Sequence, residues 1–184
     1  MQATVDISKA LSVQGWMSDR ELLWLAERAR EYDTIVEFGS LMGRSTRALA
    51  DNIKESGTIW AVDPWAGDYY QVDGDVLRMV NTYCYPQFYE NLKDHIDCGR
   101  VIPTRGFSYS FKLPFVVDMV FIDGDHRYET VLKDIDKTLE LVRPGGMICG
   151  HDWDHPNWPG VRQAVTIKFG FVDVEDTIWW KIRP

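Results

Sequence analysis

The chain has 184 residues, about the size of one domain, and 45% of them are hydrophobic, which is enough to build a buried core. Its formal net charge of -8 argues against a nucleic-acid backbone as the main partner, and no run of about 18 apolar residues is present to span a bilayer. Because the N-terminus lacks the basic and then apolar pattern of a secretion signal, and the cysteines Cys84, Cys98 and Cys149 fit no zinc spacing, we expect a cytoplasmic protein with reduced thiols.

Predicted helices and strands alternate along most of the chain. The first helix begins with the capping-box pair Ser18 and Glu21, which precedes apolar residues at helical spacing. Helices are expected over 18–32, 43–55, 85–97, 128–142 and 159–170. Strands are expected over 34–40, 58–65, 100–106, 116–123, 147–153, 171–176 and 177–184, and the last two are close enough to form a hairpin. The glycines of "RPGG", 143–146, are typical of a helix end, so we expect the fourth helix to stop there.

This alternation predicts an α/β fold, in which a parallel sheet is covered by helices on both faces. No internal repeat or linker interrupts the pattern, so residues 1–184 are expected to form a single domain. An N-terminal helical segment, 1–31, precedes the regular part. The aromatic-rich segment 66–99 is less regular, and it is the best candidate for a lid or a substrate-binding insertion.

Polar or conformationally free residues stand where several predicted strands end. In a parallel sheet the carboxyl ends of the strands meet at one edge, and ligands bind beyond that edge. The residues that meet this condition are Glu37, Gly39, Asp63, Asp123, Asp125, His126, His151 and Asp152. Their concentration at one edge is more specific than any single motif, and it predicts a binding site.

The turn "EFGSLMGRST" after the first predicted strand places Gly39 and Gly43 ahead of a helix. Its G-x-x-x-G spacing differs from the G-x-G-x-x-G of dinucleotide-binding turns, and no Gly-Lys-Ser/Thr follows as in a P-loop. Glu37 at the strand end would repel a diphosphate and favour a positively charged ligand. Asp63, at the end of the next strand, stands where an acidic residue binds ribose hydroxyls, although it could instead cap the turn before Pro64. A ligand with a ribose and a positive charge but no phosphate is S-adenosylmethionine.

Four segments together resemble the class I S-adenosylmethionine-dependent methyltransferases, and more narrowly the group that includes the macrocin O-methyltransferase and cephalosporin-hydroxylase-like proteins. These segments are "VEFGSLMGRSTRALA", "AVDPW", "FIDGDHRYETVLKDIDKTLELVRPGGMICGHDW" and "PGVRQAV", and the similarity covers about residues 34–165. The resemblance implies a Rossmann-like three-layer sandwich with a mostly parallel seven-strand sheet and an antiparallel last strand.

By this resemblance, one set of residues would bind S-adenosylmethionine. It consists of Glu37, Gly39, Ser40, Gly43 and Ser45 near the methionine end, Asp63 at the ribose, Ser108 at the adenine, and also Asp123. Phe107 or Tyr109 could contact the adenine as well. Ser40 stands where many relatives carry a second glycine, which leaves the details of this turn open.

The resemblance also implies a divalent cation at the ends of two neighbouring strands. Metal-dependent relatives use an aspartate at the first strand end and two adjacent polar residues at the second, and Asp123, His151 and Asp152 match those positions. Hard cations such as Mg2+ prefer oxygen ligands. Because His151 replaces a usual acidic residue, another divalent metal is also compatible. The alternative is that His151 and Asp152 only cap the end of the strand.

His126, three residues after Asp123, matches the residue that deprotonates the substrate hydroxyl in these relatives. A histidine near its unperturbed pKa of about 6.5 suits this role, so His126 and Asp123 are the expected catalytic residues. The alternative is that His126 only donates to a loop carbonyl. Asp125 could cap the following helix or orient His126.

The sequence therefore predicts an S-adenosylmethionine-dependent methyltransferase that acts on a hydroxyl group of a small molecule, assisted by Mg2+ or another divalent cation. Two alternatives stay open: a hydroxylase-like or other metal-dependent enzyme on the same scaffold, and a non-catalytic S-adenosylmethionine-binding module. We expect no nucleic-acid or membrane partner, and a homodimer is compatible with a chain of this kind.

Overall fold

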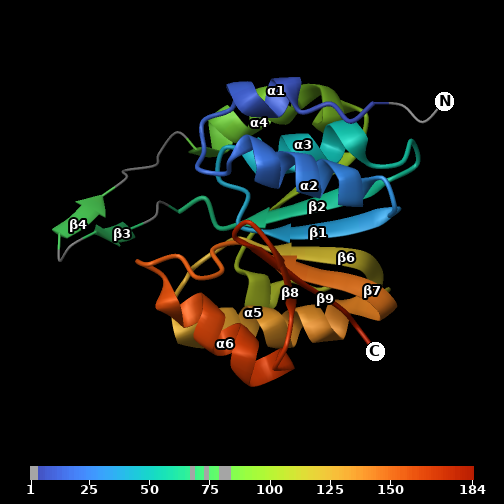
Figure 1. Cartoon of the computed structure of the whole chain (residues 1–184). Helices are drawn as coiled ribbons and strands as arrows, with labels where there is room; N and C mark the ends of the chain where they lie inside the picture. Colours follow the sequence, from blue (N-terminus) through green and yellow to red (C-terminus); the bar gives the residue numbers. More distant parts are fainter. Residues whose placement is uncertain (1–3, 67–68, 73–74, 79–83) are drawn as a thin grey trace.

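The computed structural model describes residues 4–66, 69–72, 75–78 and 84–184, and of 69–72 and 75–78 it describes the backbone. The chain forms a three-layer sandwich with a central sheet between two helical layers (Figure 1). The helices are α1 (Ser8–Ser12), α2 (Asp19–Ala29), α3 (Arg44–Asn52), α4 (Cys84–Asp97), the 3-10 helix η1 (Ser108–Ser110), α5 (Tyr128–Leu141) and α6 (Pro159–Phe169). The strands are β1 (Thr34–Phe38), β2 (Thr58–Asp63), β3 (Tyr69–Val72), β4 (Asp75–Arg78), β5 (Val101–Arg105), β6 (Val117–Ile122), β7 (Val142–Gly150), β8 (Asp173–Glu175) and β9 (Ile178–Ile182).

The central sheet has seven strands in the order β5-β2-β1-β6-β7-β9-β8. Strands β5, β2, β1, β6 and β7 run parallel, whereas β9 runs antiparallel to both of its neighbours. The predicted Rossmann-like sheet with an antiparallel last strand is therefore confirmed, and so is the C-terminal hairpin. The strand order reverses between β1 and β6. In open α/β sheets the crevice beyond such a reversal is where ligands bind.

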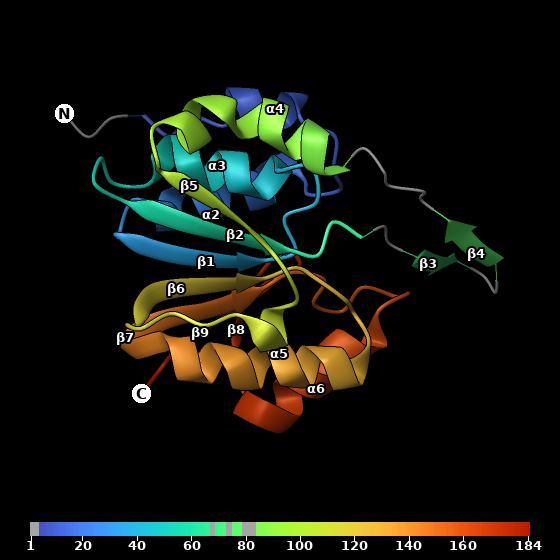
Figure 2. The same cartoon turned by 180° about the vertical axis from the view of Figure 1, so that it is seen from behind.

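Side chains of each strand alternate between the two faces of the sheet, as the pleat requires. On one face, Ile35 of β1 and Phe121 of β6 belong to a buried cluster with α2, α3 and α4. On the other face, Val36 and Ile122 belong to a second cluster with α5 and α6. Figure 2 shows the same two helical layers from behind. Because helices cover both faces, the polar ends of the parallel strands meet at the edge of the sheet.

The predicted N-terminus of α2 is confirmed. Ser18 Oγ accepts a hydrogen bond from Glu21 N at 3.3 Å, and Glu21 Oε2 accepts one from Ser18 N at 2.7 Å, which completes the capping box. The preceding helix α1 was not predicted, because five residues are too few to show a helical period. It packs against α3 and buries Ala10.

Strand β7 begins earlier than the sequence predicts. Helix α5 ends at Leu141, and Val142 already pairs with β6, so the "RPGG" segment lies within the strand. Gly146 approaches β6 so closely that a Cβ would lie 2.6 Å from the carbonyl oxygen of Asp118. The helix ends before this segment, as predicted, but no glycine caps it: Val142 follows in an extended conformation, and the glycines accompany a register shift in the pairing of β6 with β7.

The segment 66–99 contains a hairpin and a helix. Strands β3 and β4 pair with each other and extend from the body of the molecule beyond the carboxyl ends of β1 and β2 (Figures 1 and 2). Helix α4 instead belongs to the helical layer, where Phe88 and Leu92 are fully buried. Residues 67–68, 73–74 and 79–83 lie outside the described residues, so a lid formed by this segment stays a prediction. None of the helices in the described part of the chain is long and apolar enough to cross a membrane.

Candidate functional site

The turn after β1 packs directly against the end of β6. Gly39 N donates to Val62 O at 2.9 Å, and Asp123 N donates to Phe38 O at 2.7 Å. Gly39 has a φ of +90°, and a Cβ at this position would lie 2.1 Å from the carbonyl oxygen of Asp123. Gly43, with a φ of +89°, leads into α3. The two glycines predicted to meet the cofactor therefore shape the turn at the reversal of strand order.

Glu37, at the end of β1, holds this turn from inside the protein. Its carboxylate is fully buried and accepts hydrogen bonds from the hydroxyl groups of Ser40 at 2.6 Å, Ser45 at 2.6 Å and Thr46. Burial raises the pKa of Glu37 to about 7, against the opposite effect of the three hydroxyls. The structure thus brings Glu37, Ser40 and Ser45 together, and Thr46 is a partner that the sequence did not indicate. Contact of this group with a cofactor stays a prediction.

Asp63 ties the end of β2 to the same turn. Its carboxylate accepts hydrogen bonds from the backbone N–H groups of Ser40 at 3.0 Å and Leu41 at 2.9 Å. It also accepts one from Trp65 N at 2.6 Å, which is the turn-capping contact that the sequence left as an alternative. Burial raises the pKa of Asp63. If Asp63 binds a ribose as predicted, its carboxylate must do so while it accepts these three backbone hydrogen bonds.

Ser108 in η1 donates a hydrogen bond from its hydroxyl to Asp134 of α5. Asp134 is 2% exposed, and burial raises its pKa to about 6, which the hydrogen bond from Ser108 opposes. Its signal in the sequence is a carboxylate within the buried stripe of an amphipathic helix, between Val131 and Ile135. Asp134 was not among the predicted site residues. The predicted adenine contact of Ser108 is untested.

Asp123, His126, His151 and Asp152 meet where β6 and β7 end. His126 Nε2 lies 2.6 Å from Asp152 Oδ2 and 3.9 Å from Asp123 Oδ1. His151 Nδ1 lies 3.4 Å from Asp123 Oδ1 and 3.2 Å from Asp152 Oδ2. The side chains of Asp123 and His126 are still 20% and 16% exposed, although His126 Nε2 itself is buried. The residues predicted to bind a metal and to catalyse are thus in one cluster.

The carboxylates and imidazoles of this cluster shift one another's pKa. Burial tends to lower the pKa of His126, but Asp123 and Asp152 outweigh it and raise this pKa to about 9. In the same way, and again against the effect of burial, the pKa of His151 is held well above its usual value and that of Asp152 well below. In this arrangement His126 carries a proton at neutral pH. A cation bound by the two aspartates would lower the pKa of His126.

The donor atoms of the cluster fit a divalent cation. Asp123, His126 and Asp152 each offer one ligand atom, and these atoms lie within 4.8 Å of one another. His126 Nε2 is buried and, although close to Asp152, makes no hydrogen bond to any of the described residues. A cavity of about 10 Å³ borders Asp123, His126 and His151, which is about the space of one water molecule. Two of the predicted ligands, Asp123 and Asp152, belong to this set. It contains His126 in place of the predicted His151, whose Nδ1 lies 3.4 and 3.2 Å from the same two carboxylates.

Glu21 is a site residue that the sequence analysis missed. It lies in the first turn of α2, is 4% exposed, and places Oε1 3.1 Å from His151 Nε2. Burial tends to raise the pKa of Glu21, but His151, Thr177 and the backbone of Ser18 lower it to about 2. The capping box marks this residue in the sequence, yet it gives no indication of a partner 130 positions away.

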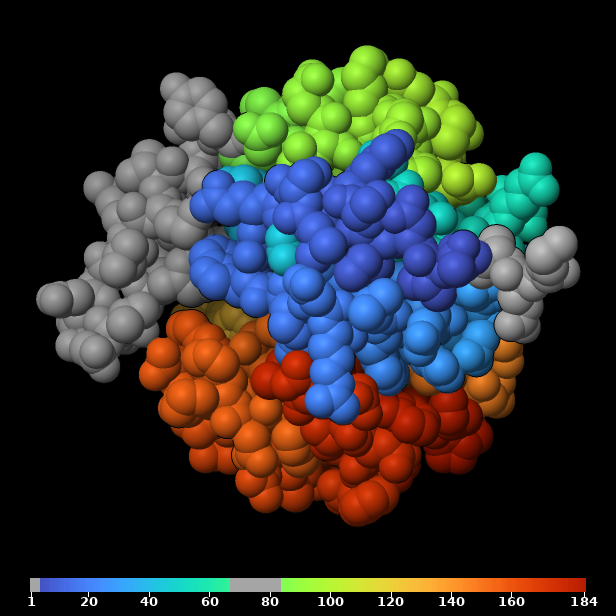
Figure 3. Space-filling view, turned by 45° about the horizontal axis from the view of Figure 1, so that its top comes forward, coloured from blue at the N-terminus to red at the C-terminus, as the bar shows by residue number. Residues whose placement is uncertain are grey.

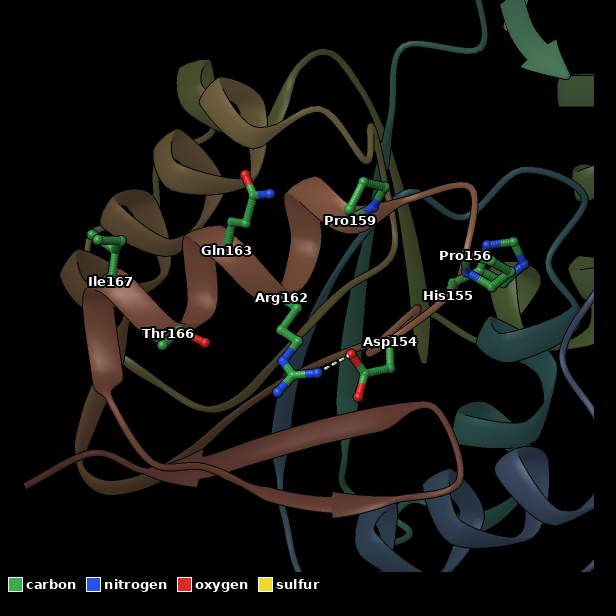
Figure 4. Close-up of a pocket in the computed structure, with 8 residues that line it drawn as sticks. All are labelled: Asp154, His155, Pro156, Pro159, Arg162, Gln163, Thr166 and Ile167. Atoms are coloured by element: carbon green, nitrogen blue, oxygen red, sulfur yellow. Dashed lines mark hydrogen bonds and ion pairs between the residues drawn. The ribbon is translucent and has the colours of Figure 1, made fainter. Parts of the chain in front are cut away.

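Asp154 and His155 lie on the loop that follows the cluster. A hollow of about 610 Å³ lies along α6, and the carboxylate of Asp154 forms an ion pair there with Arg162 at 2.5 Å. Figure 4 shows the residues that line it. The ring of Trp158, on the same loop, stacks on His126 with 4.7 Å between the ring centroids. The loop therefore covers one side of His126 and borders the hollow.

Comparison with known sequences identifies a family and a viral relative. Residues 36–153 match the family described as a methyltransferase domain. Over 144 residues the chain is 27% identical to an uncharacterized protein, R132, of Acanthamoeba polyphaga mimivirus, and the match covers 72% of this chain and 57% of the viral protein. The chain thus spans little more than half the length of that relative.

Solved structures share the fold. An O-methyltransferase from Bacillus cereus in complex with SAH is 16% identical with a TM-score of 0.67, and the alignment covers 95% of this chain and 86% of that one. The O-methyltransferase TomG from Streptomyces achromogenes, involved in tomaymycin synthesis and solved with SAM, is 16% identical with a TM-score of 0.64, covering 92% and 82%. At such low identity the likeness establishes the architecture alone.

Proposed function

Because the chain belongs to the methyltransferase-domain family, we propose that it transfers a methyl group from S-adenosylmethionine to a hydroxyl oxygen of a small molecule, assisted by a divalent cation. The observation that carries this proposal is the cluster of Asp123, His126, His151 and Asp152 beside the turn at Gly39. The neighbours solved with SAM or SAH support the choice of cofactor, because they bind it on the same fold.

In this proposal S-adenosylmethionine lies across the carboxyl ends of β1 and β2. The turn at Gly39 and Gly43 would approach its methionine end, and Glu37 would support that turn from behind. A carboxylate has about four lone-pair sites. Because three backbone N–H groups use Asp63, about one site remains for a ribose hydroxyl. Ser108 would contact the adenine.

Methyl transfer to oxygen is an in-line displacement, so the acceptor oxygen must be aligned with the methyl carbon and the sulfur. Asp123 touches the turn at Gly39 and also belongs to the cation cluster, so in this proposal it would lie between cofactor and acceptor. Asp123, His151 and Asp152 would hold the cation; Mg2+ suits the carboxylates, and Mn2+ or Fe2+ suits the imidazole. When bound, the cation would lower the pKa of the acceptor hydroxyl and fix its position.

His126 would accept the proton of the acceptor hydroxyl. Its ring is held between Trp158 and the two aspartates, and Nε2 faces Asp152. With the aspartates engaged by a cation, the pKa of His126 would fall from about 9 toward the range of a useful base. In this proposal His126 would therefore act as a base only when the cation is bound.

One observation favours a second candidate function. Two imidazoles and two carboxylates in one cluster are also the donor types of non-haem iron oxygenases, so the alternative is a hydroxylase-like enzyme on the same scaffold. Turnover with labelled S-adenosylmethionine in the absence of oxygen separates the two. Methyl transfer continues under these conditions, whereas hydroxylation stops.

Titration calorimetry with S-adenosylmethionine, with EDTA, Mg2+ or Mn2+, tests the proposed cofactor. A screen of hydroxylated small molecules, with mass spectrometry for products heavier by one CH2 unit, tests the reaction. We expect cofactor binding in every condition and product only where a cation is present. The absence of any binding would contradict the proposal, and activity that survives EDTA would remove the cation from it. Binding without any product would favour a non-catalytic module.

A further inference from the structure

Glu21 connects parts of the fold that are far apart in the sequence. The N-terminal end of α2 packs on the turn between β8 and β9, where Ser18 Oγ lies 3.3 Å from Asp176 Oδ2. Figure 3 shows this surface, with the N-terminal residues in blue against the C-terminal ones in red. Glu21 Oε1 accepts a hydrogen bond from Thr177 Oγ1 at 2.5 Å, so the carboxylate is held from the C-terminal hairpin as well.

Helix capping accounts for only one of the two carboxylate oxygens. Oε2 accepts the hydrogen bond from Ser18 N that belongs to the capping box. Oε1 faces away from this contact, toward His151 Nε2 at 3.1 Å. A capping residue gains nothing from burial, yet Glu21 is 4% exposed. The second oxygen and the burial therefore need another explanation.

The contact with Glu21 determines which nitrogen of His151 keeps its proton when a cation binds. An ionised carboxylate only accepts hydrogen bonds, so Nε2 must be the donor. Beside Asp123 and Asp152, which raise its pKa, His151 also carries a proton on Nδ1 when no cation is bound. A cation displaces that proton and leaves the lone pair on Nδ1, because Nε2 keeps its proton toward Glu21. Nδ1 is the atom that faces Asp123 at 3.4 Å and Asp152 at 3.2 Å. Glu21 therefore directs the lone pair into the cluster.

We propose that Glu21 is a positioning residue, which holds His151 Nε2–H so that Nδ1 is presented as a ligand atom beside Asp123 and Asp152. This inference rests on the cation of the proposed function. Carboxylates on the far nitrogen of a ligand histidine commonly fix its ring and tautomer, and their loss weakens metal binding about 10–100-fold. Here the carboxylate comes from the N-terminal helix, and the imidazole from the end of β7.

The substitution Glu21→Gln tests the proposal with little change of shape. The amide oxygen can still accept from Ser18 N, while the amide NH2 facing His151 Nε2 would favour the tautomer with its proton on Nδ1. Mn2+ alone is titrated into the cofactor-free protein. We expect the Kd to rise about 10–100-fold. Thr177→Val, which removes the hydroxyl that holds Oε1, should raise the Kd in the same direction.

The matched control is Ser18→Ala, which removes the capping hydroxyl at the same helix end but leaves the Glu21 carboxylate in place. It should keep the wild-type Kd for Mn2+, and thermal unfolding confirms that each variant is folded at the assay temperature. The proposal is overturned if Glu21→Gln and Thr177→Val bind Mn2+ like the wild type, or if Ser18→Ala binds as weakly as Glu21→Gln.

A second readout separates this inference from the proposed function. In cation-free protein, 15N NMR of the His151 ring should show an Nε2–H that is protected from solvent exchange in the wild type and in Ser18→Ala, and this protection should be lost in Glu21→Gln, whose amide NH2 cannot accept the hydrogen bond. If the wild type binds no Mn2+, the cation of the proposed function fails, and this spectrum still decides whether Glu21 orients His151. A wild-type spectrum without the protected Nε2–H would overturn the inference.

Discussion

The backbone of Gly39 lies against the backbone of Asp123. A Cβ at Gly39 would lie 2.1 Å from the carbonyl oxygen of Asp123 and 2.7 Å from the Cα of Gly124. The same turn fixes the amide of Asp123, which donates to Phe38 O at 2.7 Å. The turn predicted to bind S-adenosylmethionine and the first residue of the cation cluster therefore share one junction, so a change in one should affect the other.

Replacing Gly39 by alanine should disturb both sites. Gly99→Ala is the matched control, because Gly99 has a φ of +77° but has nothing within 4 Å of a new Cβ. We expect Gly99→Ala to cost about 1–2 kcal/mol of unfolding free energy from the left-handed backbone alone. Gly39→Ala should cost about 2 kcal/mol more, because the backbone of Asp123 must move. Urea unfolding and S-adenosylmethionine titration measure both effects. If Gly39→Ala and Gly99→Ala lose the same unfolding free energy, close contact between the backbones of Gly39 and Asp123 is contradicted.

His126→Asn should lower the rate of methyl transfer about 10²–10⁴-fold while the affinity for S-adenosylmethionine stays the same, because a general base acts on the acceptor and not on the cofactor. His155→Asn is the control, since His155 is half-buried on the neighbouring loop and lies outside the cluster. The measurements are single-turnover rates and calorimetry. A wild-type rate in His126→Asn would exclude it as the base. A loss of Mn2+ affinity in the same variant would identify it as a ligand.

Asp152→Asn should weaken Mn2+ binding without unfolding the loop. Asp152 has a φ of +64°, a conformation that asparagine tolerates, whereas alanine would add strain. The control is Asp154→Asn, which has a φ of +58° on the same loop but pairs with Arg162 outside the cluster. We expect only the first variant to lose cation affinity, by about 10-fold or more. Similar affinities for both variants would argue against Asp152 as a ligand.

Glu37 should make the protein less stable as the pH rises from about 4.5 to 7. Its pKa is raised from 4.5 to about 7 in the folded protein, so folding favours the protonated acid. That contribution is complete below the unfolded pKa and is lost as the pH passes the folded pKa. Relative to Glu37→Gln, the wild type should lose up to about 3 kcal/mol of unfolding free energy across this range.

Urea unfolding of the wild type and of Glu37→Gln at several pH values gives this difference directly. Glu129→Gln, at an exposed position of α5, provides the control and should show no such trend. If the unfolding free energy of the wild type, relative to that of Glu37→Gln, stays constant or rises with pH, the raised pKa is contradicted.

Elements with a strong local pattern could be predicted, and irregular ones could not. The start of α2 follows from Ser18 and Glu21, and the apolar run before Asp123 places β6. The "RPGG" segment misled, because a glycine needed for close strand contact has the same sequence signature as one that ends a helix. Helix α1 is too short for its period to be seen. The narrower resemblance to the macrocin O-methyltransferase group stays a prediction.

The sequence by itself determined which chemical groups stand at the carboxyl ends of the strands, because a buried strand and the polar residues that follow it are neighbours in the chain. Only the tertiary structure decided which of these groups meet. It brings Glu21 into contact with His151 and Asp134 into contact with Ser108, and the members of these pairs lie 130 and 26 positions apart in the chain. Such contacts depend on how α2 and α5 dock on the sheet. That docking is set by the packing of the two buried clusters, which no local pattern contains.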